Sequence, residues 1–408
     1  MKKLLRVFSF CLIFFSSCKK TGSLPEETVA GSGPAPAQRI NQSFEANGKF
    51  SSYVGFDLDM DFNYSIVGDP GLDAAGALRR GAAYIFTRPV NSNVWTQEAA
   101  IKHANAVTND NFGFEVAIDG INAVSCTNDS LYAFRKTGSK WLQVQAFVPG
   151  NLPAEGLSVS SIDIDGDHMI VGHASRKLGS RWSVGAVYFF RWVNNAWVYQ
   201  STFTSPNAGE YDWFGIEVSM YGNYALVGAR GGSDPCSGTG PDGHGGKAYV
   251  YLRSGNTWTR QATIAPPDLV KGDLFGESLD IYENIAVIGA SQGGRGCSFN
   301  QVGKVYVYRR SGTTWTRDVT ILSPDYMTDG NFGRAVALSK NYLAVSGGGN
   351  DGAVYFFSRF GLSFFYNSTD TNPVPTGRNF GCQLVTDSTQ HYLAGQSNLG
   401  HFHFGTVY

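Results

Sequence analysis

The stretch that decides the fold is "YDWFGIEVSMYGNYALVGARGGS", residues 211–233, in which a Phe-Gly pair and a Val-Gly-Ala flank a short turn. Nearly the same pattern returns in "GDLFGESLDIYENIAVIGASQGG", residues 272–294. Further copies begin near residues 53, 111, 157, 331 and 379, so the pattern recurs seven times at intervals of roughly 55 residues. Seven copies fill residues 39–408 and leave no room for a second domain.

Each copy predicts four β-strands. Apolar residues alternate with polar ones in the first segment, as at Val218 and Met220, which is the period of a strand. Gly222 and Gly255 lie in short segments of the kind that tight hairpins require. In the fourth copy the strands are expected over 215–220, 224–229, 247–253 and 257–265. Four antiparallel strands per copy, seven times over, predict an all-β fold, a seven-bladed β-propeller.

The last copy is short, because the chain ends at Tyr408 after its third strand. The segment that begins at residue 39, "RINQSFEANGKF", is similar to the fourth strand and exit loop of the fourth copy. An open ring would leave an unpaired strand edge. We therefore expect the N-terminal strand to complete the last blade.

The N-terminus has the pattern of a secretory signal. Lys2, Lys3 and Arg6 precede the apolar run 7–15, which is too short to span a bilayer. The sequence Phe15-Ser16-Ser17-Cys18 resembles the lipobox of bacterial lipoproteins, although Phe stands where Leu is usual. An ordinary cleaved signal is the alternative.

The lipoprotein resemblance implies that residues 1–17 are removed and that a lipid is attached to Cys18. Residues 18–38, rich in Gly, Pro and Ser, then form a flexible tether before the propeller domain 39–408. The lipoprotein resemblance also implies that the protein is an outer membrane lipoprotein of the bacterial cell envelope, either periplasmic or surface-exposed. Such a protein would contact the membrane through this lipid only.

A second resemblance concerns the repeat itself. Phe214-Gly215 and Val227-Gly228-Ala229 resemble the FG-GAP repeat, the unit of the integrin α-subunit propeller, and of bacterial secreted proteins built from it. The resemblance covers residues 39–408 and implies a module for binding or adhesion.

Composition and motifs exclude several other functions. With 32 basic and 33 acidic residues, the chain has no basic excess to bind nucleic acid. In integrins the first hairpin is often expanded into a Ca²⁺ loop, but here it is short. In 57–61 and 163–167 the acids alternate with apolar residues, as on a strand edge, so we expect no structural calcium and no cofactor. No catalytic motif is present and nothing singles out acids converging on the ring axis, so we expect no enzyme.

Two cysteines, Cys236 and Cys297, lie at equivalent points of adjacent copies. In an oxidising compartment they are candidates for a cross-blade disulfide. Equivalent loops of neighbouring blades can also lie too far apart for that bond. Both alternatives stay open.

The long connections join the second strand to the third and the fourth to the first, so they all emerge on one face. Arg and Trp are typical of recognition surfaces, although single exposed charges are more often simply solvated. We expect a monomer that binds a protein or glycan there; a polysaccharide lyase or glycosidase, and a purely structural envelope protein, are the alternatives. The candidate binding residues are Arg79, Arg80, Arg176, Arg181, Trp182, Arg230, His244 and Arg295.

Overall fold

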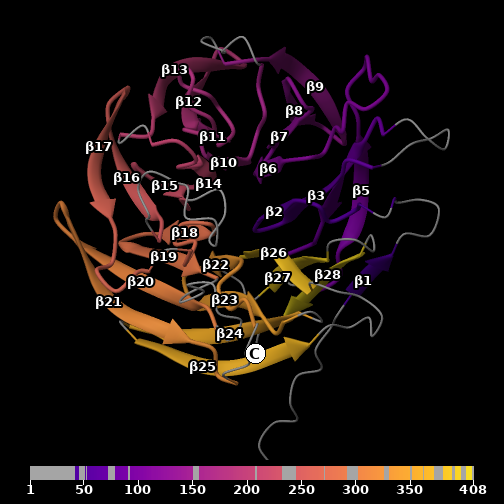
Figure 1. Cartoon of the computed structure of the whole chain (residues 1–408). Helices are drawn as coiled ribbons and strands as arrows, with labels where there is room; N and C mark the ends of the chain where they lie inside the picture. Colours follow the sequence, from indigo (N-terminus) through magenta and orange to yellow (C-terminus); the bar gives the residue numbers. More distant parts are fainter. Residues whose placement is uncertain are drawn as a thin grey trace, which may run out of the picture. The chain divides into compact units, whose positions relative to one another are not determined.

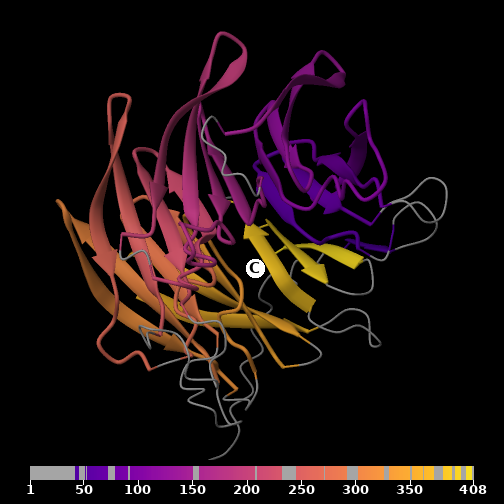
Figure 2. The same ribbon diagram turned by 45° about the horizontal axis from the view of Figure 1, so that its top comes forward.

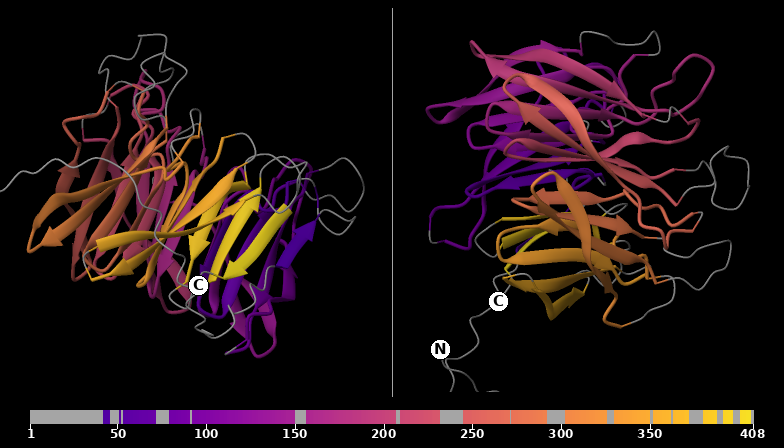
Figure 3. Two further views of the ribbon diagram at one scale, coloured as in Figure 1. Left: turned by 90° about the horizontal axis from the view of Figure 1, so that it is seen from below. Right: turned by 90° about the vertical axis from the view of Figure 1, so that its left-hand side faces the viewer.

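The computed structural model describes residues 42–45, 51, 53–71, 79–90, 92–149, 156–206, 209–231, 245–270, 272–291, 302–325, 330–349, 352–361, 363–371, 380–387, 391–396 and 401–406. These residues form seven four-stranded antiparallel sheets around one axis and contain no helix. Figure 1 shows the ring with the first strand of each sheet innermost, and Figures 2 and 3 show it from other sides. The predicted seven-bladed propeller is confirmed.

Each sheet is one blade, whose first strand lies at the axis and whose fourth strand lies at the rim. Blade 1 consists of β2 (Leu58–Asp61), β3 (Tyr64–Asp69), β4 (Ala82–Thr87) and β5 (Thr96–Ile101). Blade 2 consists of β6 (Val116–Asp119), β7 (Asn122–Cys126), β8 (Leu131–Thr137) and β9 (Lys140–Phe147). Blade 3 consists of β10 (Ser161–Asp165), β11 (His168–His173), β12 (Ala186–Val193) and β13 (Ala196–Thr204). Blades 4 and 5 are β14 (Phe214–Tyr221), β15 (Tyr224–Ala229), β16 (Lys247–Ser254) and β17 (Thr257–Ile264); and β18 (Leu279–Tyr282), β19 (Ile285–Ala290), β20 (Lys304–Ser311) and β21 (Thr314–Leu322). Blades 6 and 7 are β22 (Val336–Leu338), β23 (Tyr342–Gly347), β24 (Ala353–Phe360) and β25 (Ser363–Thr371); and β26 (Phe380–Thr386), β27 (His391–Gln396), β28 (His401–Thr406) and β1 (Gln42–Glu45).

The strands lie where the alternation predicts them. In blade 4 they differ from the expected ranges by one residue at an end, and the turns at Gly222 and Gly255 both have φ of +60°. That left-handed conformation is the one that Gly adopts without steric cost. Backbone preference and side-chain pattern therefore specify the same hairpins.

The hydrophobic core lies between blades. Trp258 of blade 4 stacks on Phe189 of blade 3 with ring centres 4.4 Å apart, and Trp95 of blade 1 stacks on Phe404 of blade 7 at 4.8 Å. Burying such a side chain contributes roughly 2–3 kcal/mol. Because each outer-strand Trp covers the preceding blade, no blade is complete without its neighbour.

The ring is closed by the N-terminal strand, as predicted. β1 pairs antiparallel with β28, from Gln42 opposite Phe404 to Glu45 opposite His401. The Gln42 side chain also exchanges two hydrogen bonds with the Trp95 backbone of blade 1, at 2.7 and 3.2 Å. Gln145 of blade 2 makes the same pair of bonds to Trp197 of blade 3, so β1 takes the role of a fourth strand in full.

The Phe-Gly and Val-Gly-Ala glycines of the repeat meet across the blade boundary. A Cβ added at Gly228 of blade 4 would lie 2.0 Å from the carbonyl oxygen of Gly276 in blade 5. The same contact joins Gly172 to Gly215 at 2.1 Å. The glycines of the repeated sequence thus form a contact through which one blade packs on the next.

Candidate binding face and axial channel

The long connections lie on the face opposite the tight hairpins, here called the long-loop face. On blade 3 the connection between β11 and β12 holds three of the predicted binding residues, Arg176, Arg181 and Trp182. The Trp182 side chain is 51% exposed, and the Lys177 ammonium lies 3.0 Å from its ring centre. This places a cation and an exposed indole together, a combination that favours recognition.

The same loop is fixed against blade 4. The backbone N–H of Tyr211 donates to the Trp182 carbonyl at 2.8 Å, and that of Trp213 donates to the Ser183 carbonyl at 2.9 Å. Tyr211 and Trp213 have φ of +62° and +54°. Left-handed backbone is costly for large aromatic residues, so the surrounding hydrogen bonds hold these two rings in place.

Arg230 joins this group from blade 4. Its guanidinium lies 5.1 Å from the Trp213 ring centre and forms an ion pair with Glu277 at 3.0 Å. Arg176 lies 5.9 Å from the Tyr188 ring centre. The structure therefore brings four predicted residues together at the boundary of blades 3 and 4.

Arg79 and Arg80 lie apart from that group, at the boundary of blades 1 and 2. The Arg79 guanidinium stacks 5.2 Å from the ring centre of Tyr53. The Arg80 carbonyl accepts the backbone N–H of Phe112 at 3.1 Å, a bond that joins the two blades. His244, Arg295, Cys236, Cys297 and Cys18 lie outside the described residues.

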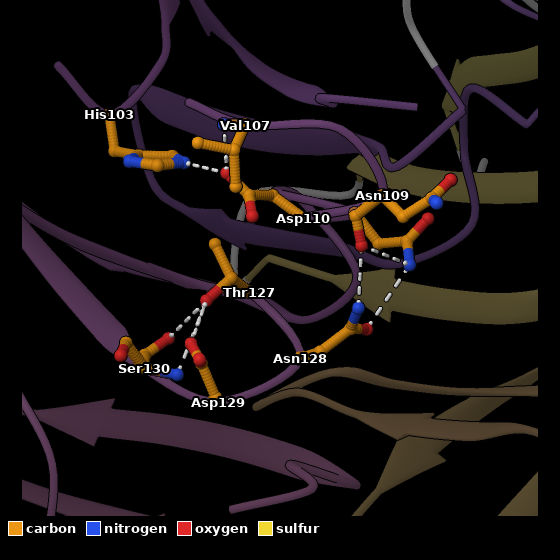
Figure 4. A network of polar contacts seen from close by, with 9 residues as sticks. His103, Val107, Asn109, Asp110, Thr127, Asn128, Asp129 and Ser130 are labelled. Carbon is orange, nitrogen blue, oxygen red and sulfur yellow. Dashed lines mark hydrogen bonds and ion pairs between the residues drawn. The ribbon is translucent and has the colours of Figure 1, made fainter. Parts of the chain in front are cut away.

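Next to Arg79, the loops that open blade 2 are held by polar side chains (Figure 4). Asp110 accepts from the Val107 backbone at 2.5 Å and contacts the His103 ring nitrogen at 2.8 Å. Asn128 donates to the Asn109 carbonyl at 2.7 Å. The long-loop face is thus preorganised at this boundary.

Two connected groups of hollows, of about 140 and 280 Å³, lie on the ring axis. Alternate residues of the first strands line them in three tiers, and ten of these residues are acidic. No Lys, Arg or His lines either hollow. From the long-loop face downward the tiers are Asp57, Glu115, Ser161, Glu217 and Gln383; Asp59, Asp163, Ser219, Asp280, Ala337 and Val385; and Asp61, Asp119, Asp165, Tyr221, Tyr282, Ser339 and Asp387.

Most of these carboxylates bind the next blade. Asp57 and Asp59 of blade 1 accept the backbone N–H groups of Val116 and Ile118 in blade 2, both at 2.7 Å. Equivalent bonds run from Met220, Gly222 and Leu338 to the acids Asp163, Asp165 and Asp280. The first strand of a blade is a sheet edge whose outward N–H groups would otherwise lack partners. The expectation that the acids of 57–61 and 163–167 satisfy a strand edge is confirmed.

Glu115 and Glu217 differ, because no backbone N–H of a neighbouring blade is bound to either carboxylate in the described residues. Glu217 accepts from the Ser161 hydroxyl at 3.0 Å. Burial raises the pKa of Glu217 to about 8 and that of Glu115 well above its usual range, and nearby carboxylates add to both effects. Glu217 therefore holds a proton near neutral pH.

Burial also raises the pKa of Asp59 to about 7 and those of Asp57 and Asp280 to about 6. Asp387 forms an ion pair with the buried Arg88 at 3.2 Å. Among the residues that the structure describes, no group of three or more His, Cys, Asp and Glu is arranged to hold a metal ion.

The sequence alone did not single out acids that converge on the axis, but the structure places ten of them there. The sequence did carry a signal, because Glu115 and Glu217 each stand three residues after the Phe of their repeats, as Asp57 does after Val54. Within a single copy, each acid resembles an ordinary polar residue of an alternating strand. Only closure of the ring places them in one channel.

The sheets, their order and the closing strand define the class: a seven-bladed β-propeller with short hairpins on one face and long loops on the other. The sequence family with the description FG-GAP repeat matches residues 197–251 and 258–308. Both matches begin in the fourth strand of one blade and end in the third strand of the next. These two copies of the repeat therefore match the FG-GAP repeat.

No curated protein matches the chain in sequence. In the described residues, no helix has the length and apolar character needed to cross a membrane.

Proposed function

We propose that this protein is a binding module of the bacterial cell envelope, anchored by a lipid on Cys18, that takes a protein or glycan ligand on its long-loop face. The FG-GAP propeller fold supports a role in binding or adhesion. The observation that carries the proposal is the group at the boundary of blades 3 and 4, where Trp182 is half exposed with Lys177 over its ring and Arg230 lies over the ring of Trp213.

A screen of glycans and envelope proteins for binding to the wild-type protein tests this proposal. The affinity of each ligand found is then measured for the Trp182→Ala variant. Removing an exposed aromatic at the centre of a binding surface is expected to weaken binding on the order of tenfold or more. Phe360→Ala is the matched control, because Phe360 is 83% exposed in a tight hairpin of the opposite face. Equal affinity of wild type and Trp182→Ala for every ligand found would contradict the proposal.

A polysaccharide-active enzyme is the second candidate, and the axial glutamates favour it. Glycoside hydrolysis uses two carboxyl groups, one of them protonated. Glu115 and Glu217 are two buried carboxyl groups on the axis whose pKa values burial raises, that of Glu217 to about 8. Release of reducing sugar by the wild type and its loss in Glu217→Gln would support this function. Binding of a polysaccharide without release of reducing sugar would instead support the binding module.

A further inference from the structure

A hollow of about 220 Å³ lies on the long-loop face where blade 1 meets blade 2. It is here called the Arg79 hollow, and its main walls are Tyr53, Phe56, Arg79, Asn111 and Phe114. It is smaller than the roughly 300–1,000 Å³ of sites for drug-sized ligands. One ring with its substituents fits this space better than an extended segment does.

The walls of the hollow are flat and apolar. Phe56 and Phe114 face each other with ring centres 4.6 Å apart, and Tyr53 is 38% exposed. Aromatic faces of this kind pack against flat rings and C–H faces, and a Tyr also offers a hydroxyl at its edge.

Arg79 supplies a cation. Its Nη2 donates to the Tyr53 hydroxyl at 3.3 Å, which holds the guanidinium on the aromatic wall. Among the described residues, no carboxylate forms an ion pair with Arg79 and no acidic side chain lines the hollow. A guanidinium held in this way matches a carboxylate, which it binds through two parallel hydrogen bonds.

Asn111 supplies an acceptor on the opposite wall. Its side-chain Nδ2 donates to the Asn109 carbonyl and to Asn128 Oδ1, both at 3.1 Å. Both amide hydrogens are then used, so Oδ1 is the atom left to accept a hydroxyl. The backbone N–H of Asn111 donates to the Arg79 carbonyl at 3.0 Å, which ties the two polar walls together.

We propose that the Arg79 hollow binds one uronic acid unit of an acidic polysaccharide, which deepens and rests on the proposed binding function. The sugar ring lies against the aromatic walls, its carboxylate pairs with Arg79, and a hydroxyl donates to Asn111. An Asp or Glu side chain would leave the aromatic walls uncovered. An apolar or aromatic group would leave the guanidinium without an anion.

Titration calorimetry with uronic acid oligosaccharides, and with neutral oligosaccharides of the same length, tests the proposal. The wild type is expected to bind uronic acid oligomers at least tenfold more tightly than the neutral ones. Arg79→Gln should lose that preference, and Tyr53→Ala should weaken both. Arg260→Gln is the matched control, since it removes the same charge from an exposed position on the outer strand of blade 4, away from the long-loop face. Unchanged melting temperatures will show that the variants fold.

Three results overturn the proposal: no binding of uronic acid oligomers by the wild type, equal binding of neutral oligomers, or an unchanged preference in Arg79→Gln. If one of these occurs while another ligand still binds in a Trp182-dependent way, only the hollow loses its assignment. If Trp182→Ala, like Phe360→Ala, also binds every ligand as tightly as the wild type, the proposed binding function fails together with the assignment of the hollow.

Discussion

At the scale of the residue, the glycines of the repeat act at the boundary between blades. Five boundaries place a second-strand glycine against the carbonyl of a first-strand glycine, for example Gly68 against Gly113 and Gly395 against Gly55. At the boundary of blades 2 and 3 both places have changed together, to Cys126 and Ser160. Ser160 does not have a positive φ, unlike the glycines at its place in the other blades. At the boundary of blades 6 and 7 only the second-strand glycine has changed, to Ser346, and Gly381 is kept.

Gly228→Ala is expected to destabilise the propeller because its Cβ would lie 2.0 Å from a backbone oxygen that cannot move without the whole strand. Forcing an extra methyl into such a contact costs typically 1–3 kcal/mol. Gly222→Ala is the control: it introduces backbone strain of about 1 kcal/mol but its Cβ meets nothing within 4 Å. Urea unfolding of both variants measures the difference. Equal losses would show that the Gly228 contact is unimportant.

At the scale of the element, several edge strands have a partner outside their own sheet. Inner strands are bound through the axial carboxylates. Outer strands are bound through Gln side chains, which contact the Trp95 backbone from Gln42 and the Trp315 side chain from Gln261. β1 takes part in this system although it is short and distant in sequence from the blade that it completes.

A protein that begins at residue 48 is expected to melt at a clearly lower temperature than one that begins at residue 39. The shorter form lacks β1, so β28 becomes an open edge and Trp95 loses both bonds to Gln42. Thermal unfolding followed by circular dichroism compares the two forms. Equal melting temperatures would mean that β1 does not close the ring.

Strands, blade number and closure were predictable from the sequence because they rest on features that every copy repeats. Alternation at Val218 and Met220, and glycines at the turns, act within one hairpin. The Arg79 hollow and the axial glutamates were not predictable in this way. Tyr53 and Asn111, like Glu115 and Glu217, belong to different copies, and their meeting depends on how blades pack rather than on any local pattern.

At the scale of the whole molecule, the axial channel concentrates acidic groups, and burial raises the pKa of several of them. The native state raises their pKa values above those of the unfolded chain, so it holds more protons than the unfolded state near neutral pH. Stability that depends on these protons is present at low pH and is lost as the pH rises through the folded pKa values.

The free energy of unfolding is therefore expected to fall between pH 6.5 and pH 8.5, the range in which Asp59 and Glu217 titrate at about 7 and about 8. Buried His403, whose pKa is lowered to about 4, destabilises the folded protein only as the pH falls below 6.5, so it does not affect the profile in this range. Glu217→Gln should raise stability at pH 8.5 more than at pH 6.5. A profile that is flat or rises over this range would contradict the assignment. Urea unfolding across the pH series is the measurement.

The pairing of β1 with β28 also governs the order in which the molecule can be made. A chain that leaves the ribosome or crosses a membrane with its N-terminus first presents Gln42–Glu45 before any of the strand His401–Thr406 exists. Six sheets can assemble in turn, but the seventh waits for both ends. Contacts between such distant segments form slowly and leave partly assembled chains exposed to aggregation. Until its final residues are available, the unfinished ring is therefore exposed to self-association.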